Sequence, residues 1–386
     1  MKKVVIAIDS FKGCLPSAEA GEAAARGIRS VFPECEIRCL PIADGGEGML
    51  EVLITATNGQ EVHVSAHGPL MEERDTHYGI SGDGKTAFIE MASISGLPLV
   101  PPEKRNPMLT TTYGTGELIC DALERGCRNF IIGIGGSATH DAGLGMLQAL
   151  GFRFTNKEGK ETGTGSGEVL LKVASVDRTF VHPALNSCRF TVACDVQNPF
   201  YGPEGAAYIF APQKGADRKM VEMLDAGMRS FAEVTFRTTG KDISHHPGSG
   251  AAGGMGGSLL AFLNAELKPG IQLMLDALDF NNIMEGADLI ITGEGKADKQ
   301  TLMGKVPSGI LERAKEQKIP VILLAGNVED TDKLNEAGFQ GVFPIVPSPL
   351  SLEQAMIPES ARANIQRTTE QICRIIMLNK RLNLVP

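Results

Sequence analysis

The stretch KKVVIAI, residues 2–8, decides the fold. It is a continuous apolar run that ends at the polar loop DSFKG, residues 9–13, and this pattern is typical of a buried parallel strand. A helix capped by Ser17 and running to about Phe32 is predicted next, and CEIRCLPI, residues 35–42, is predicted as the following strand. Right-handed βαβ connections bring the loops after both strands to one sheet edge, where the ligands of open α/β sheets bind.

The C-terminal third repeats this order of elements. ADLIITGEG, residues 287–295, predicts a strand that enters a glycine-rich loop, and Pro307 begins a predicted helix. IPVILLAGNV, residues 319–328, predicts another buried strand. Both ends of the chain therefore show the pattern of a parallel sheet with helical crossovers.

These patterns predict a discontinuous α/β protein of two domains. Residues 1–74 and 262–386 are expected to form a parallel, doubly wound, Rossmann-like domain, and residues 75–261 a second α/β domain inserted between them. The insert reads differently, since it contains hairpin turns and the glycine-dense segment TGTGSGE, residues 162–168. A chain of 386 residues is long enough to bury a core in each domain.

Composition argues against several classes of function. The net charge is -9 and no run of Lys or Arg forms a basic stripe, so nucleic acid and anionic membranes are not expected as partners. The opening MKKVVIAIDS has too few apolar residues for a secretory signal, and no stretch approaches ~18 uninterrupted apolar residues, so we expect a soluble cytoplasmic protein. The eight cysteines include no C-x-x-C pair, which argues against zinc and favours reduced thiols.

GISGDGKT, residues 79–86, fits the phosphate-loop pattern G-x-x-x-x-G-K-[ST], but its flanks favour another interpretation. A phosphate loop needs a buried strand before it and a helix after it. Here RDTHYGI and TAFIEMA are short runs with β-branched and aromatic residues, and Asp83-Gly84 between them is a strong hairpin signal. We therefore predict a β-hairpin with Lys85 beside its turn, and we expect any nucleotide to bind elsewhere.

IIGIGGSATHDAGLG, residues 131–145, joins a predicted strand to a predicted helix that begins near Asp141. Its G-x-G-x-x-A pattern resembles a dinucleotide fingerprint, but no second parallel strand ending in an acidic residue follows. A phosphate cradle fits better, because glycines let the backbone approach an anion while hydroxyls and helix N–H groups donate to it. The cradle residues are Gly135, Gly136, Ser137 and Thr139. A tight strand-to-helix turn with a hydroxyl cap is the alternative.

Acidic residues occupy loops that follow apolar strands. They are Asp44 in ADGGEG, Asp195 in ACDVQNP, and Glu294 and Asp298 in TGEGKADKQT. Carboxylates in such places can bind magnesium or accept a substrate proton, although each alone is also compatible with a turn or a cap. Lys12 in DSFKG and Lys214 in APQKG can neutralise phosphate or carboxylate charge. The set as a whole indicates phosphoryl transfer to a small acidic molecule.

With these motifs in order, the chain resembles the bacterial glycerate kinases of the type that includes the galactarate-pathway enzyme. The matching segments span nearly the whole chain: IAIDSFKG, PIADGGEGM, GDGKTAFIEMA, TTYGTGELI, GIGGSATHDAGLGMLQALG, ACDVQNP, APQKGAD, GAAGGMGG and DLIITGEGKADKQTLMGKVP. The resemblance implies a cytosolic kinase that uses ATP and Mg²⁺ to phosphorylate D-glycerate in a cleft between two α/β domains. It favours 2-phosphoglycerate over 3-phosphoglycerate as the product, and it leaves a homo-oligomer open.

Roles for the site residues follow from this resemblance together with the chemistry of phosphoryl transfer. Asp195 is expected as the base or a magnesium ligand, and Asp44 and Glu294 as carboxylates for metal or substrate. Lys12 and Lys296 are expected to neutralise anionic charge. The expected nucleotide-binding residues are Gly135, Gly136, Ser137, Thr139, Lys296 and Asp298.

Some positions depart from the family pattern, and two rival functions stay open. The family usually has proline where Ile8 stands, asparagine where His140 stands and arginine where Lys296 stands. A lysine keeps the positive charge of arginine but loses its bidentate geometry. The rivals are an NAD-dependent hydroxy-acid dehydrogenase, which uses a substrate of similar size, and a two-lobed carboxylate-binding protein without catalytic activity.

Overall fold

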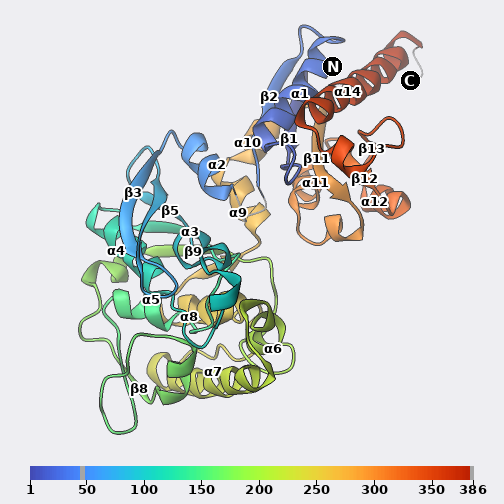
Figure 1. The fold of residues 1–386 in the computed structure, drawn as a ribbon. Coiled ribbons are helices and arrows are strands. Elements are labelled where there is room, and N and C mark those ends of the chain that lie inside the picture. The colour runs from blue at the N-terminus through green and yellow to red at the C-terminus, as the bar shows by residue number, and fades with distance from the viewer. Residues whose placement is uncertain (44–47, 383–386) are drawn as a thin grey trace. The chain divides into compact units, whose positions relative to one another are not determined.

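The computed structural model of the protein describes residues 1–43 and 48–382, with side chains up to residue 378. The chain forms two compact units, one from Met1–Asp44 with Met274–Pro386 and one from Gly45–Leu273 (Figure 1). Each unit contains a β-sheet with helices packed on it. The expected α/β fold class is therefore confirmed, with a parallel sheet built from both ends of the chain and a second α/β part inserted.

The first unit contains a five-stranded parallel sheet in the order β13-β12-β11-β1-β2. Its strands are β1 (Lys3–Ile8), β2 (Glu36–Cys39), β11 (Leu289–Ala297), β12 (Val321–Val328) and β13 (Gly341–Pro344). From β1 the chain crosses to β2 on one side, and from β11 it crosses through α11 (Val306–Glu316) to β12 on the other. Because such crossovers are right-handed, these opposite directions place helices on both faces of the sheet. The strand order reverses between β1 and β11.

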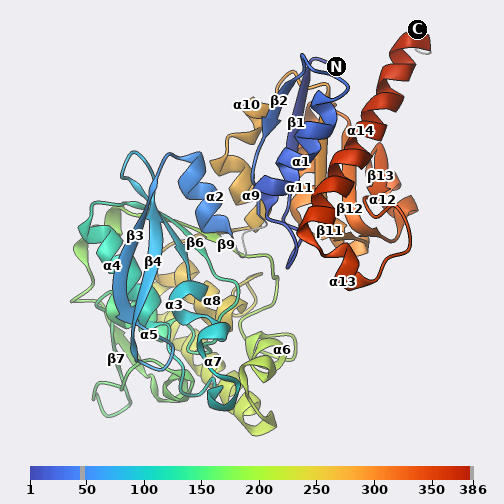
Figure 2. The ribbon, with the colours of Figure 1, turned by 45° about the horizontal axis from the view of Figure 1, so that its top comes forward.

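The sheet face that bears Val4, Ile6 and Ile8 is covered by α1 (Ser17–Arg29) and α14 (Pro358–Leu382). The two helices lie side by side in Figures 1 and 2, and their apolar side chains fill the layer between helices and sheet. Their backbones approach closely at Gly27, where a Cβ atom would stand 2.4 Å from the carbonyl oxygen of Gln366. A side chain at this position would force the helices apart, so glycine is required.

Ser17 does not cap α1, contrary to the prediction. Pro16 occupies the cap position. The hydroxyl of Ser17 instead donates to the carbonyl oxygen of Ile8 (2.6 Å) and accepts from the amide of Ile42 (2.9 Å). The side chain therefore ties the carboxyl end of β1 to the segment that follows β2. α1 also ends earlier than predicted, at Arg29.

The second unit contains a six-stranded mixed sheet in the order β10-β9-β6-β5-β4-β3. Its strands are β3 (Gln60–His67), β4 (Glu73–Ile80), β5 (Thr86–Glu90), β6 (Asn129–Gly133), β9 (Arg189–Ala193) and β10 (Glu266–Lys268). The last four are parallel, so their carboxyl ends share one edge, whereas β3 and β4 run antiparallel to their neighbours. The helices are α2 (Met49–Ala56), α3 (Ala92–Ser95), α4 (Tyr113–Glu124), α5 (Leu144–Ala149), α6 (Ala206–Phe210), α7 (Arg218–Thr239) and α8 (Met255–Phe262).

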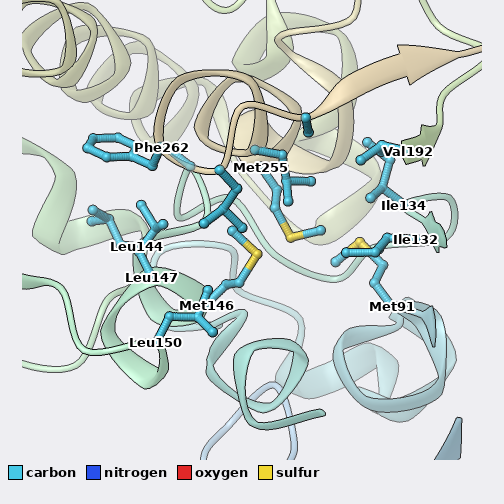
Figure 3. Close-up of a cluster of buried hydrophobic side chains, with 14 of the residues drawn as sticks. Met91, Ile132, Ile134, Leu144, Met146, Leu147, Leu150, Val192, Met255 and Phe262 are labelled. Atoms are coloured by element: carbon cyan, nitrogen blue, oxygen red, sulfur yellow. The ribbon is translucent and has the colours of Figure 1, made fainter. Parts of the chain in front are cut away.

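The core of the second unit forms where its central strands meet α5 and α8. Figure 3 shows Ile132 of β6, Val192 of β9, Leu147 of α5, and Met255 and Phe262 of α8 within one cluster, and all of them are buried. Such a core, shared by the strands and helices that flank the loop after β6, holds that loop between fixed elements.

The segment GISGDGKT forms the predicted β-hairpin. β4 and β5 pair antiparallel, with Gly79 opposite Phe88. In the turn, Oδ1 of Asp83 accepts from the Ser81 hydroxyl (2.6 Å) and the Lys85 amide (3.0 Å). A strand follows this turn where a phosphate loop would need a helix, so the hairpin prediction is confirmed.

The borders between the units differ from those expected at residues 74/75 and 261/262, and strand pairing explains why. β3 pairs along its length with β4, α2 packs on β4 and β5, and β10 pairs with β9, so these elements belong to the second unit. The second border lies within α9 (Gly270–Ala277). The first unit also contains α10 (Phe280–Met284), α12 (Thr331–Ala337) and α13 (Leu352–Ala355).

Candidate functional site

A cavity of about 810 Å³ lies at the carboxyl edge of the sheet in the first unit. Asp9 and Lys12 reach it from the loop after β1, Glu294 and Lys296 from the last part of β11, and Asn327 from β12. This edge includes the point between β1 and β11 where the strand order reverses. Open α/β sheets bind their ligands at such a point, so the fold itself marks this cavity as a candidate site.

Apolar side chains form much of the cavity wall. They come from the loop after β1, the segment after β13, α13 and the start of α14: Phe11, Ile345, Val346, Pro349, Leu350, Leu352, Ala355, Met356 and Ala361. Leu352 is 74% exposed and Leu350 is 41% exposed. Large apolar side chains gathered and exposed beside a charged cavity are typical of a ligand-binding wall.

Glu294 is the most informative charged group of this cavity. It is only 5% exposed, and its Oε2 accepts from Nζ of Lys305 at 3.2 Å. Burial raises the pKa of Glu294, and the nearby Thr301 hydroxyl and Lys305 ammonium partly offset this shift. Its Oε1 is buried and makes no hydrogen bond of good geometry to any described residue. A carboxylate oxygen in this state is suited to take a proton or a cation.

Lys296 and Asp298 form an ion-paired group beside Glu294. Nζ of Lys296 lies 3.4 Å from Oδ2 of Asp298 and 3.2 Å from Oε1 of Glu329. The hydrogen bonds that Lys296 donates to Glu329 and Asp298 raise its pKa, so it carries a positive charge at neutral pH. Asp298 also caps the short 3₁₀ turn Lys299–Leu302, because its side chain accepts from the amide of Gln300. Asp298 therefore has a structural role whatever else it does.

The second group of predicted residues lies in the second unit, in the loop between β6 and α5. Gly135 and Gly136 are exposed, whereas Ser137 and Thr139 are buried. Gly136 has a positive φ of 71°, a backbone conformation that favours glycine. The exposed backbone of the two glycines is the part of this loop that a ligand can reach.

Lys214 contacts the buried side of this loop. Its side chain is 2% exposed, and Nζ donates to Oγ of Ser137 at 2.7 Å and to the carbonyl oxygen of Thr139 at 2.6 Å. Burial lowers the pKa of Lys214 to about 7, and the carboxylate of Asp141 opposes the shift. Lys214 thus fixes the shape of the loop and places an ammonium group behind it.

The helix after this loop begins at Leu144, later than predicted. The reason is Asp141, which is fully buried. Its Oδ2 accepts from the amide and hydroxyl of Thr112 (both 2.8 Å) and the amide of Gly145 (3.1 Å), and its Oδ1 accepts from the amide of Gly143 (3.1 Å). The sequence predicted free helix N–H groups here, but Asp141 already binds these two amides.

His140 belongs to the same loop, and its side chain is buried against α7. Its Nε2 lies 3.0 Å from Sδ of Met228. Burial, with a contribution from the charge of Lys214, lowers the pKa of His140 well below its usual value. On the other side of the loop, a Cβ atom at Gly253 would stand 2.3 Å from the carbonyl oxygen of Thr139. The glycines of GAAGGMGG therefore serve close packing at this point.

Asp195 lies at the same sheet edge as this loop. β9, which Asp195 follows, pairs in parallel with β6, which the loop follows, and Ala193 is opposite Gly133. Asp195 is exposed, and its Oδ1 accepts from the amide of Gly270 at the start of α9 (2.8 Å). The carboxylate thus combines access to solvent with a fixed position.

Residues 4–377 match the family model described as the glycerate kinase family. The chain belongs to the glycerate kinase family. It is 47% identical over 384 residues to "Glycerate kinase" of Bacillus subtilis (strain 168), covering 99% of this chain and 100% of that protein. It is 46% identical over 380 residues to "Glycerate 2-kinase" of Escherichia coli (strain K12), covering 98% and 99%. A crystal structure of a glycerate kinase 2 from Salmonella typhimurium LT2 matches with a TM-score of 0.89 and 43% identity, covering 98% of this chain and 99% of that one.

Within this glycerate kinase family member, the predicted site residues fall into two groups. The group in the first unit comprises Lys12, Glu294 and Lys296, with Asp298 attached through its ion pair. The group in the second unit comprises Gly135, Gly136, Ser137, Thr139 and Asp195. Asp44 lies outside the described residues. Each group occupies the carboxyl edge of the parallel strands in its unit.

The structure also adds residues to which the sequence gave no role in the site. Asp9 lines the cavity at the end of β1, and Lys305 pairs with Glu294 from the cap position of α11. Asp9 directly follows an apolar strand, and Lys305 comes just before Pro307, which begins a predicted helix. The sequence therefore carried a signal for each residue. In the part of the chain that the structure describes, no group of three or more His, Cys, Asp or Glu residues could hold a metal ion. No helix there has the length and apolar character needed to span a membrane.

Proposed function

We propose that this protein transfers the γ-phosphoryl group of ATP to a hydroxyl of D-glycerate and produces 2-phosphoglycerate. The observation that carries the proposal is the family match over residues 4–377, because it spans both units and every loop with a described site residue. The relative named "Glycerate 2-kinase" supports the choice of product. We further propose that the protein acts in the cytoplasm on this small-molecule substrate.

The reaction needs a proton acceptor and positive charge. A glycerate hydroxyl oxygen attacks the γ-phosphorus, the bond from that phosphorus to the bridging oxygen breaks, and ADP leaves with the electron pair. The hydroxyl proton passes to a carboxylate, for which Asp195 is our first choice and Glu294 the second. The raised pKa of Glu294 makes it a better proton acceptor than an ordinary surface carboxylate.

The other proposed roles concern charge and position. Lys12 and Lys296 neutralise anionic groups of the ligands, and Asp298 orients Lys296 through their ion pair. The backbone at Gly135 and Gly136 approaches a phosphate, in a loop that Ser137 and Thr139 fasten to Lys214. Asp44 is proposed as a further carboxylate for metal or substrate.

The residues present fit a magnesium ion bound together with the nucleotide. Mg²⁺ commonly takes one or two protein carboxylates, keeps several waters and binds substrate phosphates, so it needs no cluster of protein ligands. Two carboxylates are each proposed as a magnesium ligand, Glu294 in the first unit and Asp195 in the second, and the buried Oε1 of Glu294 is an oxygen donor of the required chemistry. When bound, Mg²⁺ neutralises charge on the phosphate oxygens.

The test is to incubate the purified protein with D-glycerate, ATP and Mg²⁺ and to identify the product by phosphorus NMR. We expect 2-phosphoglycerate and ADP, with glycerol a much poorer acceptor because it lacks the carboxylate that a cationic site binds. Equal turnover of glycerol and glycerate would contradict the proposal. NAD-dependent absorbance changes would support the dehydrogenase, and glycerate binding without turnover would support the carboxylate-binding protein.

A further inference from the structure

We propose that the cavity of the first unit is the binding site for the adenosine half of the nucleotide, with the adenine ring against its apolar wall. This inference rests on the proposed use of ATP, and it assigns the base of the nucleotide to one unit. The residues that carry it lie at the carboxyl ends of β1, β11 and β13 and at the start of α14.

The first argument is size. The cavity has a volume of about 810 Å³, and sites for cofactors and other ligands of that size commonly enclose about 300–1,000 Å³. Glycerate has only about seven non-hydrogen atoms, so it would leave most of this volume to water. A nucleoside with its phosphates would occupy far more of the volume.

The second argument is the chemistry of the wall. Phe11, Val346, Leu350 and Met356 present apolar surface to the cavity. Burying such surface is favourable only against an apolar partner, and glycerate carries a polar group on every carbon atom. A purine ring has flat faces that can cover this wall, and its edge can still form hydrogen bonds.

The third argument is the charge at the other part of the lining. Lys12, Lys296 and Lys305 reach the cavity together with Asp9 and Glu294. Lysine side chains of this kind bind phosphate as point charges, and neighbouring carboxylates suit a nucleotide that carries a divalent cation. One cavity thus combines an apolar wall for a base with mixed charges for a metal–phosphate tail.

The composition of the chain makes a direct test available, because the protein contains no tryptophan. Met356→Trp places one fluorophore in the cavity wall, and Leu350→Trp places one at a partly exposed wall position in case the first variant folds poorly. The control Phe236→Trp places the fluorophore at an exposed position of α7 in the second unit. Mg-ATP, adenosine and D-glycerate are titrated separately into each variant.

We expect a saturable change in fluorescence with Mg-ATP and a weaker-binding response to adenosine in the cavity variants, and no response to D-glycerate alone. The control variant should not respond to adenosine. Adenosine is decisive, because it has no phosphate and reports only on the site for the base. If neither folded cavity variant responds to Mg-ATP or adenosine, or if D-glycerate alone gives the change, the assignment is overturned.

A matched pair of lysine variants tests the charged part of the cavity by calorimetry with Mg-ATP. Lys12→Ala should raise the dissociation constant about tenfold or more, because it removes a charge-assisted contact. Lys85→Ala removes an exposed lysine from the hairpin turn and should change it very little. The reverse order would contradict the assignment and restore the phosphate-loop interpretation of GISGDGKT.

These measurements separate the failure of this inference from failure of the proposed function. If the cavity variants phosphorylate glycerate but their fluorescence does not change with nucleotide, the site assignment is wrong and the proposed function is still supported. A saturable response to Mg-ATP without any phosphorylation of glycerate would support the site and count against the function.

Discussion

His140 and Lys214 are buried at the carboxyl end of β6, where ionised side chains lose the hydration that water provides. Burial lowers the pKa of both residues, and the charge of Lys214 contributes further to the low pKa of His140. His140 is therefore a titratable group in a place that disfavours its charge.

We predict that His140 makes folding sensitive to mild acid. An unfolded histidine binds a proton below pH of about 6.5, whereas folded His140 stays neutral until its lower pKa is reached, so stability falls as pH drops through this window. The expected loss is about 1.4 kcal/mol per pH unit below 6.5. His140→Asn should remove this part of the pH dependence in urea unfolding at pH 6.5 and 5.5. The same slope in wild type and His140→Asn, with exposed His245→Asn as the control, would refute the prediction.

Single residues show what the sequence can and cannot predict at the site. Glu294 and Lys296 could be selected because they follow an apolar strand in a glycine-rich loop, and both line the cavity. Lys305, the ion-pair partner of Glu294, lies well after it in the sequence. Only the folded turn between them brings Nζ of Lys305 to 3.2 Å from Oε2 of Glu294. The burial of Lys214 could not be predicted either, because its segment carries no apolar periodicity around the lysine.

Among the elements, the join between β9 and α9 gives Asp195 two competing interpretations. Its Oδ1 accepts from the amide of Gly270, the first residue of α9, which is a purely structural contact. The same side chain is exposed at the sheet edge and is our first choice as proton acceptor or magnesium ligand.

Asp195→Asn separates the two interpretations, because an asparagine oxygen can still accept from the amide of Gly270 but cannot take the substrate proton. We predict a folded variant whose unfolding free energy is close to that of wild type and whose turnover is lower by ~100-fold or more, the usual contribution of one acid–base group. Steady-state kinetics with D-glycerate and urea unfolding measure the two quantities. Near-normal turnover in the folded variant would leave Asp195 with its structural contact alone.

The positions of the elements were easier to predict than their ends. β1, β11 and β12 are continuous apolar runs, so their positions follow from the sequence. The start of α5 did not follow, because the buried carboxylate of Asp141 takes two of the amides that a regular first turn would present. Ser17 was likewise predicted as a cap, but its hydroxyl hydrogen-bonds to the backbone of Ile8 at the end of β1 and of Ile42 after β2.

At the scale of the whole molecule, each unit has its own hydrophobic core. Ile291 of β11 belongs to the core of the first unit and Ile132 of β6 to that of the second, and both are fully buried. The insertion could be predicted from the change in pattern along the chain. Its borders could not, because the assignment of α2, β3 and β10 depends on the strands with which they pair or pack in the folded unit.

We predict that a cavity made in one core weakens mainly that unit. Ile291→Ala should cost about 2–5 kcal/mol and speed hydrogen exchange at the amides of β1, β11 and β12, with little change in β6 and β9. Ile132→Ala is the matched variant and should give the opposite pattern. Mass spectrometry of exchange by peptide measures both. Equal acceleration throughout the chain in either variant would show that the two cores unfold as one.

The construction of the first unit from both ends of the chain has a consequence during synthesis. β1 needs β11 as a neighbour, and α1 needs α14, but the ribosome makes those partners some 250–350 residues later, which at ~5–20 residues per second is a delay on the order of half a minute. The second unit, whose elements are continuous along the chain, can pack in the meantime. The edge of the apolar strand KVVIAI that pairs with β11 is therefore left open while the rest is translated, so a chaperone that binds extended apolar segments has a long opportunity there.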